Sequence, residues 1–115
     1  MSISSKYIFV AAMDVDAECE ALFNEVYDTE HVPYLLEVPG VHSVTRIKGE
    51  AFALSMGGEE ISKPAANPVY SAIYEIDGPE VLKSKEWAEA IERGRWSAEV
   101  RPHTHNKFHT MFKVL

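Results

Sequence analysis

The alternation of apolar and polar positions along the chain predicts a strand, a helix, two strands, a second helix and a last strand. Residues 6–13 are apolar on both faces and rich in strand formers, which is typical of a central strand covered on both sides. Residues 41–48, 69–76 and 107–115 alternate between two faces, as strands do. Apolar residues three and four apart, from Cys19 to Val26, predict an amphipathic helix.

Local signals set the expected bounds of the two helices. Asp14 is expected to cap the first helix, which should run to about His31 and break or kink before Pro33, a residue without an amide proton. Ser84 is expected to cap a second helix over residues 85–93, and Gly94 is a plausible stop.

The segments between these elements are expected to be irregular. Residues 55–68 carry two glycines and two prolines and form the longest candidate loop, a length often used for lids or binding loops. Residues 95–106 are also expected to be irregular. The order β-α-β-β-α-β then predicts an α+β, ferredoxin-like fold over residues 1–115, one domain with two helices on one face of an antiparallel sheet.

Such a sheet leaves its second face open. The strands would present Phe, Tyr, Ile and Val to water there, a larger apolar patch than monomers usually expose. We therefore expect a homodimer in which the open sheet faces of two copies pack together.

Composition and charge narrow the partners and the compartment. The 115 residues, 46% hydrophobic and 25% charged, suit one soluble domain. A net charge of −7 with scattered basic residues argues against nucleic acid and anionic membranes, and no stretch approaches the ~20 apolar residues that span a bilayer. Cys19 is the only cysteine, and no signal peptide is evident, so the cytoplasm is the expected location.

The polar end of the first helix is the main candidate site. The face that carries Phe23 and Val26 continues into Tyr27 and then Glu30 and His31. Polar groups on a core-facing stripe must be hydrogen-bonded or line a cavity. His31 titrates near neutral pH and suits proton transfer, whereas a packing or helix-capping role is the alternative.

The neighbours of His31 have expected roles of their own. Tyr27, one turn earlier, would hold a substrate oxygen or share its proton, and Asp28 or Glu30 would orient the imidazole. Tyr74, Trp87, Arg101 and Phe23 complete the expected ligand contacts, Arg101 by steadying an anionic group.

Other histidines carry a weaker signal. His103, His105 and His109 have spacing compatible with a metal, but no nearby carboxylate or cysteine completes a site, so we predict no metal and no cofactor. His42 and Arg46 share one face of the second strand and are expected to line the dimer interface.

The aromatic residues and the absence of common catalytic motifs narrow the possible functions further. The aromatic residues are expected mainly in the core, with a subset shaping a flat pocket. Gly57 and Gly58 lack the strand–loop–helix context of a phosphate cradle, and the chain has no Gly-x-Ser-x-Gly, His-Glu-x-x-His or Cys-x-x-Cys motif.

The chain resembles the dimeric α+β barrel superfamily, and within it EthD-like and related small bacterial proteins. The segments that carry the resemblance are residues 27–33, 35–36 and 38–41, followed by 75–82 and 86–87. Residues 101–106 are similar to the approach of these proteins to their last strand. The resemblance implies a site between sheet and helices with the helix-end histidine nearby. It also implies a range of activities, from cofactor-independent monooxygenases to haem-degrading enzymes, cyclases and isomerases.

Two functions therefore stay open at this stage. The first is a cofactor-independent enzyme of the monooxygenase, cyclase or isomerase type, acting on a small aromatic or cyclic metabolite with His31 as acid or base. The second is a non-catalytic ligand-binding or accessory homodimer.

Overall fold

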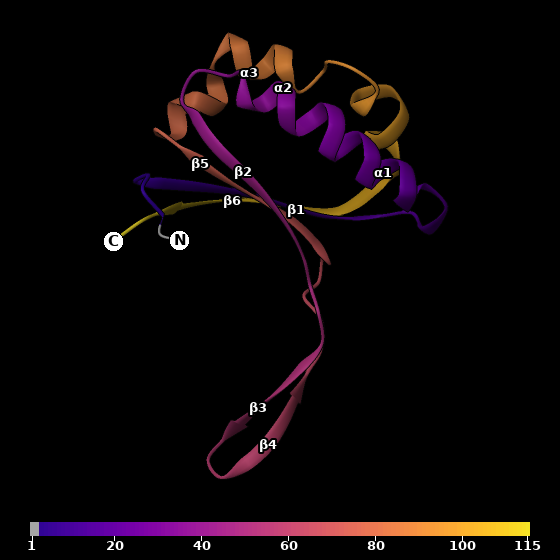
Figure 1. The fold of residues 1–115 in the computed structure, drawn as a ribbon, viewed down its shortest axis with the longest axis vertical. Helices are drawn as coiled ribbons and strands as arrows, with labels where there is room; N and C mark the ends of the chain where they lie inside the picture. The colour runs from indigo at the N-terminus through magenta and orange to yellow at the C-terminus, as the bar shows by residue number, and fades with distance from the viewer. Residues whose placement is uncertain (1–2) are drawn as a thin grey trace.

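The computed structural model describes residues 3–115 and contains a four-stranded antiparallel sheet with helices on one face (Figure 1). The strand order is β2-β5-β1-β6. The strands are β1 (Tyr7–Val15), β2 (Val41–Lys48), β5 (Tyr70–Ile76) and β6 (Thr104–Lys113). This order and the helices between the strands confirm the predicted α+β, ferredoxin-like fold.

The helical layer consists of two main helices and several short turns. A short turn, η1 (Ala17–Cys19), leads into the first helix, made of α1 (Glu20–Val26), a π-helical turn η2 (Tyr27–His31) and α2 (Val32–Leu36). The second part contains η3 (Pro79–Lys83), α3 (Lys85–Ala90), a π-helical turn η4 (Trp96–Val100) and η5 (Arg101–His103). No helix of residues 3–115 is long and apolar enough to cross a membrane.

The sequence predicted a break or kink before Pro33, but the first helix continues through this residue. It continues to Leu36, which agrees with the further turn over residues 34–36 that the sequence also allowed. The Val32 amide donates to the carbonyl of Tyr27, five residues back. A proline in a helix normally clashes with the carbonyl of the preceding turn, and the wider π turn relieves that clash. The predicted cap was also wrong, since Asp14 lies in β1 and its carboxylate accepts from the amide of Val69.

The second helix begins as predicted and ends earlier. The amide of Trp87 donates to Ser84 Oγ at 3.1 Å, which is the expected cap. The regular helix stops at Ala90 and the chain turns through Gly94, which has a φ of +69°. Residues 95–106 are then far more regular than predicted, because η4 and η5 lead directly into β6.

The expected long loop is a β-hairpin. β3 (Phe52–Met56) and β4 (Glu59–Lys63) pair in a separate two-stranded sheet that projects away from the body (Figure 1). Gly57 and Gly58 form its tip with φ values of +62° and +83°, the conformation of a tight two-residue turn. Their role is to reverse the chain, which the sequence analysis did not predict, since it placed both glycines in a long loop.

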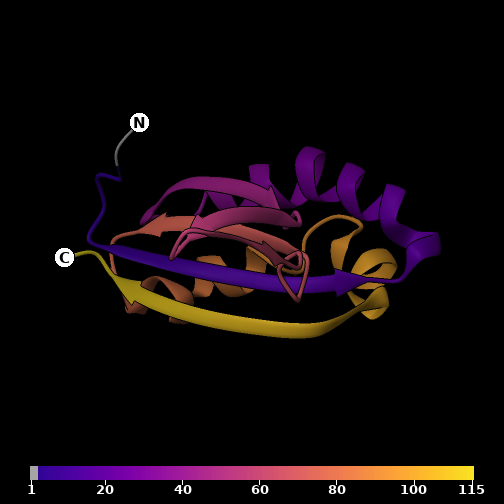
Figure 2. The same cartoon turned by 90° about the horizontal axis from the view of Figure 1, so that it is seen from below.

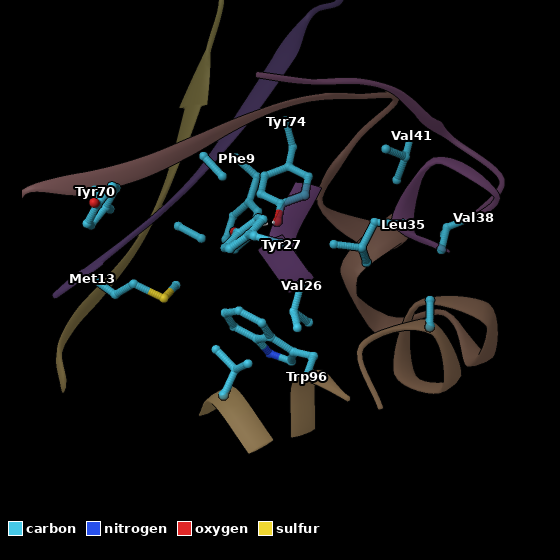
Figure 3. Packing of buried hydrophobic residues seen from close by; sticks show 14 of the residues in the cluster. Phe9, Met13, Val26, Tyr27, Leu35, Val38, Val41, Tyr70, Tyr74 and Trp96 are labelled. Carbon is cyan, nitrogen blue, oxygen red and sulfur yellow. Dashed lines mark hydrogen bonds between the residues drawn. The ribbon is translucent and has the colours of Figure 1, made fainter. Parts of the chain in front are cut away.

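The core lies between the sheet and the helices. Phe9, Ala11 and Met13 of β1 face the helices together with Tyr70, Ala72, Tyr74 and Ile76 of β5, and all seven are buried. Helical residues such as Val26, Tyr27 and Leu35 pack on them from the helical layer (Figure 3). The alternation of β5 predicted that Tyr70, Ala72, Tyr74 and Ile76 share one face, and the structure shows that this face is the buried one.

The opposite sheet face is open within the described residues. The strand register places Phe108 and Phe112 beside Ala12 and Ile8 there. Ile47, Phe108 and Phe112 are about half exposed, at 48%, 56% and 53%. Figure 2 looks onto this face, with the hairpin in front of the sheet. The protomer thus leaves the predicted apolar patch uncovered.

Candidate functional site

A cavity of about 380 Å³ lies between the helix-facing side of the sheet and the helical layer. Its walls are mainly aromatic and aliphatic, with a few polar groups. It is lined by Phe9, Ala11, Met13, Tyr27, His31, Leu35, Tyr74, Leu82, Trp87, Ile91, Trp96, Arg101, Thr104, Lys107 and His109. This combination of a concave apolar surface and few polar groups is typical of small-molecule sites.

The π turn η2 brings Tyr27 and His31 together on the cavity wall. They are its first and last residues, and their rings meet edge to face with centroids 5.0 Å apart. Both side chains are buried, His31 with only 5% of its surface exposed. π turns within helices are often found at functional sites, because the extra residue redirects side chains.

A second π turn supplies the part of the cavity wall next to His31. Trp96 begins η4, and its indole lies flat against the His31 imidazole with centroids 4.2 Å apart and planes 17° apart. It also meets Tyr27 edge to face at 4.9 Å (Figure 3). The imidazole is therefore enclosed by an indole and a phenol, which fix its orientation without an ionic partner.

The carboxylates of Asp28 and Glu30, which were expected to orient His31, bind arginines in the structure. Glu30 accepts from the backbone amide of Arg95 at 2.9 Å and from Arg95 Nε at 2.6 Å. These hydrogen bonds lower the pKa of the Glu30 carboxyl. Asp28 instead pairs with Arg46 at 2.8 Å. Glu30 thus acts on the site indirectly, because it anchors the segment that leads into Trp96.

Burial determines the charge of His31. Desolvation, with a smaller contribution from the positive charge of Arg101, lowers its pKa from 6.5 to about 3. Among buried side-chain nitrogen and oxygen atoms of the described residues, only His31 Nδ1 lacks a hydrogen-bond partner. The imidazole is neutral at neutral pH and retains unused hydrogen-bonding capacity.

Two phenols form the polar floor of the cavity. The hydroxyls of Tyr27 and Tyr74 are 3.1 Å apart and share a hydrogen bond (Figure 3). Burial raises the pKa of both groups, and for Tyr74 the neighbouring Tyr27 raises it further. Both phenols are therefore protonated at neutral pH. One hydroxyl hydrogen bridges the pair, and the other is left to donate to a ligand oxygen.

The remaining predicted contacts divide into two groups. Trp87 and Arg101 lie on the cavity wall, where Trp87 meets Phe9 edge to face at 5.9 Å. Arg101 is held by the carbonyl of Ile91, which accepts from Nη2 at 2.6 Å. Phe23 is a correction: it is fully buried against the rings of Tyr27, Tyr70 and Trp96 and does not line the cavity.

Arg46 was also placed on the wrong face. The register pairs it with Ala72, on the helix side, and its guanidinium lies 4.5 Å from the centre of the Tyr27 ring. It covers one end of the core and does not point to the open face.

Sequence reasoning missed the part of the wall that β6 provides. Lys107 and His109 face the cavity, and the His109 ring lies parallel to Phe9 with centroids 5.8 Å apart. Sequence spacing groups His109 with His103 and His105. In the structure, His103 and His105 pair with Asp16 at 3.4 and 3.3 Å and do not face the cavity. Across residues 3–115, no three His, Cys, Asp or Glu side chains gather in a metal-binding group. The alternation of β6 could have predicted this position, because it places His109 on the sheet face opposite to the one that carries Phe108.

Together the topology and the cavity define a ferredoxin-like α+β protein with a partly open cavity between its sheet and its helices, which is the architecture that the sequence resemblance implied.

Solved structures share this architecture at low sequence identity. A mutant of MhuD bound to manganese protoporphyrin IX aligns with a TM-score of 0.60 at 13% identity, over 95% of this chain and 94% of that one. The heme-degrader MhuD from Mycobacterium tuberculosis, with two hemes bound, gives 0.58 at 14% identity over 95% of each chain. An EthD family protein from Bacillus halodurans gives 0.58 at 13% identity, over 95% and 99%.

These likenesses confirm the predicted resemblance to α+β barrel and EthD-like proteins at the level of the fold. No protein-family model and no curated protein matches the sequence. The fold alone does not determine an activity, so any function must be argued from the cavity.

Proposed function

We propose that this protein binds a small cyclic or aromatic molecule in the cavity beside His31 and acts on it without a cofactor. A volume of about 380 Å³ falls within the range of ligand sites, roughly 300–1,000 Å³. Flat side chains such as Trp96, Trp87 and His109 suit a planar ring. The observation that carries the proposal is the unpartnered Nδ1 of His31, a buried polar atom beside this space.

The chemistry that these groups support is proton transfer next to a carbonyl. The neutral imidazole of His31 accepts a proton from a carbon or hydroxyl of the substrate. The free hydroxyl hydrogen of the Tyr27–Tyr74 pair donates to the oxygen on which negative charge develops. Isomerisation, cyclisation and the first step of oxygenation all begin in this way.

The charge of the wall favours a neutral or anionic ligand. Arg101 and Lys107 line the cavity, and no carboxylate does within the described residues, although the chain carries a net charge of −7. A carboxylate or enolate on the ring would be attracted to these cations, and a cation would be repelled.

The likeness to MhuD, at 13–14% identity, gives the fold and does not assign heme to this cavity. The cavity volume lies near the lower end of the range for ligand sites, roughly 300–1,000 Å³. One face of the His31 imidazole is covered by Trp96, and Tyr27 meets the same ring edge to face. The heme chemistry of MhuD is therefore not carried over, and a Soret shift on heme titration would contradict this conclusion.

One observation favours the alternative, a non-catalytic binding protein. A pKa of about 3 makes the His31 imidazole a weak base in the empty cavity. Catalysis then requires that the ligand itself stabilise the imidazolium, as an anionic intermediate does. A ligand that stays neutral would be bound without being converted.

We further propose that the functional unit is a homodimer formed through the open sheet face. Ile47, Phe108 and Phe112 are half exposed there, and a second copy would cover them.

The buried thiol of Cys19, without a second cysteine, suits a reducing cytoplasm.

Native mass spectrometry of the purified protein, followed by binding assays with cyclic ketones and aromatic acids, tests the function. His31→Gln and Tyr27→Phe should weaken binding about tenfold or more, since each removes a polar contact inside the cavity. His105→Gln is the matched control, because His105 is exposed and pairs with Asp16. Turnover of the bound compound that survives His31→Gln unchanged would refute the acid–base role.

A further inference from the structure

The β3–β4 hairpin, residues 52–63, has one apolar face. Cross-strand partners share a face, and the register pairs Phe52 with Lys63, Leu54 with Ile61 and Met56 with Glu59. The four apolar side chains therefore lie together. The other face carries small and polar residues only, namely Ala53, Ser55, Glu60 and Ser62. This pattern is that of a ribbon that packs on something apolar.

The described chain does not itself cover this face. β3 and β4 pair only with each other in residues 3–115, and Phe52 and Met56 are 57% and 55% exposed. A lone two-stranded hairpin is marginally stable in water, and an apolar face with Phe52 and Met56 exposed and Leu54 and Ile61 half-buried lowers its solubility. The hairpin needs a partner surface.

The position of the hairpin indicates which partner. It leaves the sheet after β2 and projects away from the helices, on the side of the open face (Figures 1 and 2). Ile47, near the end of β2, is exposed on that face, so the apolar surface of the sheet continues into the hairpin. A sheet packed on the open face would lie about 10 Å away from it, in the space beside the hairpin.

We propose that the hairpin is an arm whose apolar face packs on a second copy of this chain. Two-fold symmetry makes the contact reciprocal, so each protomer holds the other with its own arm. The arm contact rests on the proposed homodimer and extends its interface beyond the sheet. It also explains why a hairpin with short strands carries Phe52, Leu54, Met56 and Ile61 outside the core.

Analytical ultracentrifugation of the full chain over a concentration series tests the arm. The arm variant is Leu54→Ser with Met56→Ser, and Ala53→Ser on the opposite face is the matched control. Hydrogen exchange of amides 52–63 is measured in parallel, and Phe108→Asp provides a protomer with a disrupted sheet face.

The expected result is a dimer whose dissociation constant rises about a hundredfold in the arm variant, because both arms lose apolar burial. The control should not change it. Amides 52–63 should be protected in the dimer and exchange rapidly in Phe108→Asp.

Other results overturn the proposal in distinguishable ways. A dimer whose affinity the arm variant does not change, with unprotected amides 52–63, refutes the arm and leaves the sheet interface standing. A monomer at tens of micromolar refutes both. Protected arm amides in a monomer would mean that the arm folds onto its own chain, and open-ended assemblies would exclude reciprocal packing.

Discussion

Acidification should destabilise this protein through His31. The folded pKa is lowered to about 3, whereas the unfolded chain has the ordinary value of 6.5. Below pH 6.5 the unfolded state therefore binds a proton that the folded state does not. Stability is at its full value above pH 6.5 and falls as the pH drops toward 3, where the loss is complete.

The size of the effect follows from the same two values. Each pH unit in this interval costs about 1.4 kcal/mol, and the whole interval from 6.5 to about 3 costs on the order of 4–5 kcal/mol. That is a large part of the ~5–15 kcal/mol by which ordinary domains are stable. Carboxylates with lowered pKa values, such as Glu30, add their own losses only below about pH 4.5.

Urea unfolding at fixed protein concentration, from pH 7.5 to pH 4.5, measures this dependence. The wild type should lose about 2 kcal/mol more than His31→Gln between pH 6.5 and pH 5, because the variant has no imidazole to protonate. His105→Gln serves as the control and should follow the wild type. An NMR titration that shows the His31 ring protonating near 6.5, or equal slopes for wild type and His31→Gln, would refute the reasoning.

Three further predictions concern the walls of the site. Trp96→Ala should cost about 3–5 kcal/mol in urea unfolding, since it empties space beside His31; a cost below about 1 kcal/mol would mean that Trp96 does not pack as described. Glu30→Gln should lower the thermal unfolding midpoint and shift the NMR signals of the His31 ring, whereas Glu25→Gln, which breaks an exposed ion pair with the same arginine, should do neither. Gly94→Ala should cost more than Gly57→Ala in thermal unfolding: both glycines have positive φ, but only at Gly94 would the added methyl meet Glu30, at 2.5 Å.

Much of the fold was readable from periodicity. Alternation in 41–48 and 69–76 predicted strands there, and the structure has them. In β5 the alternation corresponds to one buried face, whereas in β2 only Val41 is buried and Arg46 lies on the face opposite to the expected one. Residues 55–68 were predicted to be a loop because they carry two glycines and two prolines. The structure pairs residues 52–56 with 59–63 across Gly57 and Gly58, and Phe52, Leu54 and Met56 alternate with Ala53 and Ser55 there.

The site was predictable in part. Tyr27 and His31 interrupt an apolar stripe, and that interruption correctly located the cavity. Trp96 and His109 were not assigned to it, because Trp96 reaches it through a π turn, which has no sequence period of its own. Helical spacing placed Glu30 near the His31 imidazole, because it reports only which residues of one helix are neighbours. It cannot predict the hydrogen bonds between Glu30 and Arg95, which is 65 residues away in the sequence.

The π turn at 27–31 lets the first helix carry one extra residue without changing the faces that its two halves present. An ordinary α turn closes with one residue fewer, so deletion of Thr29, an exposed residue of this turn, would let an α turn form in its place. Phe23 before the turn and Leu35 after it would still face the core. Tyr27 and His31 would then stand three positions apart in place of four, so the edge-to-face contact of their rings is the feature that the deletion would change.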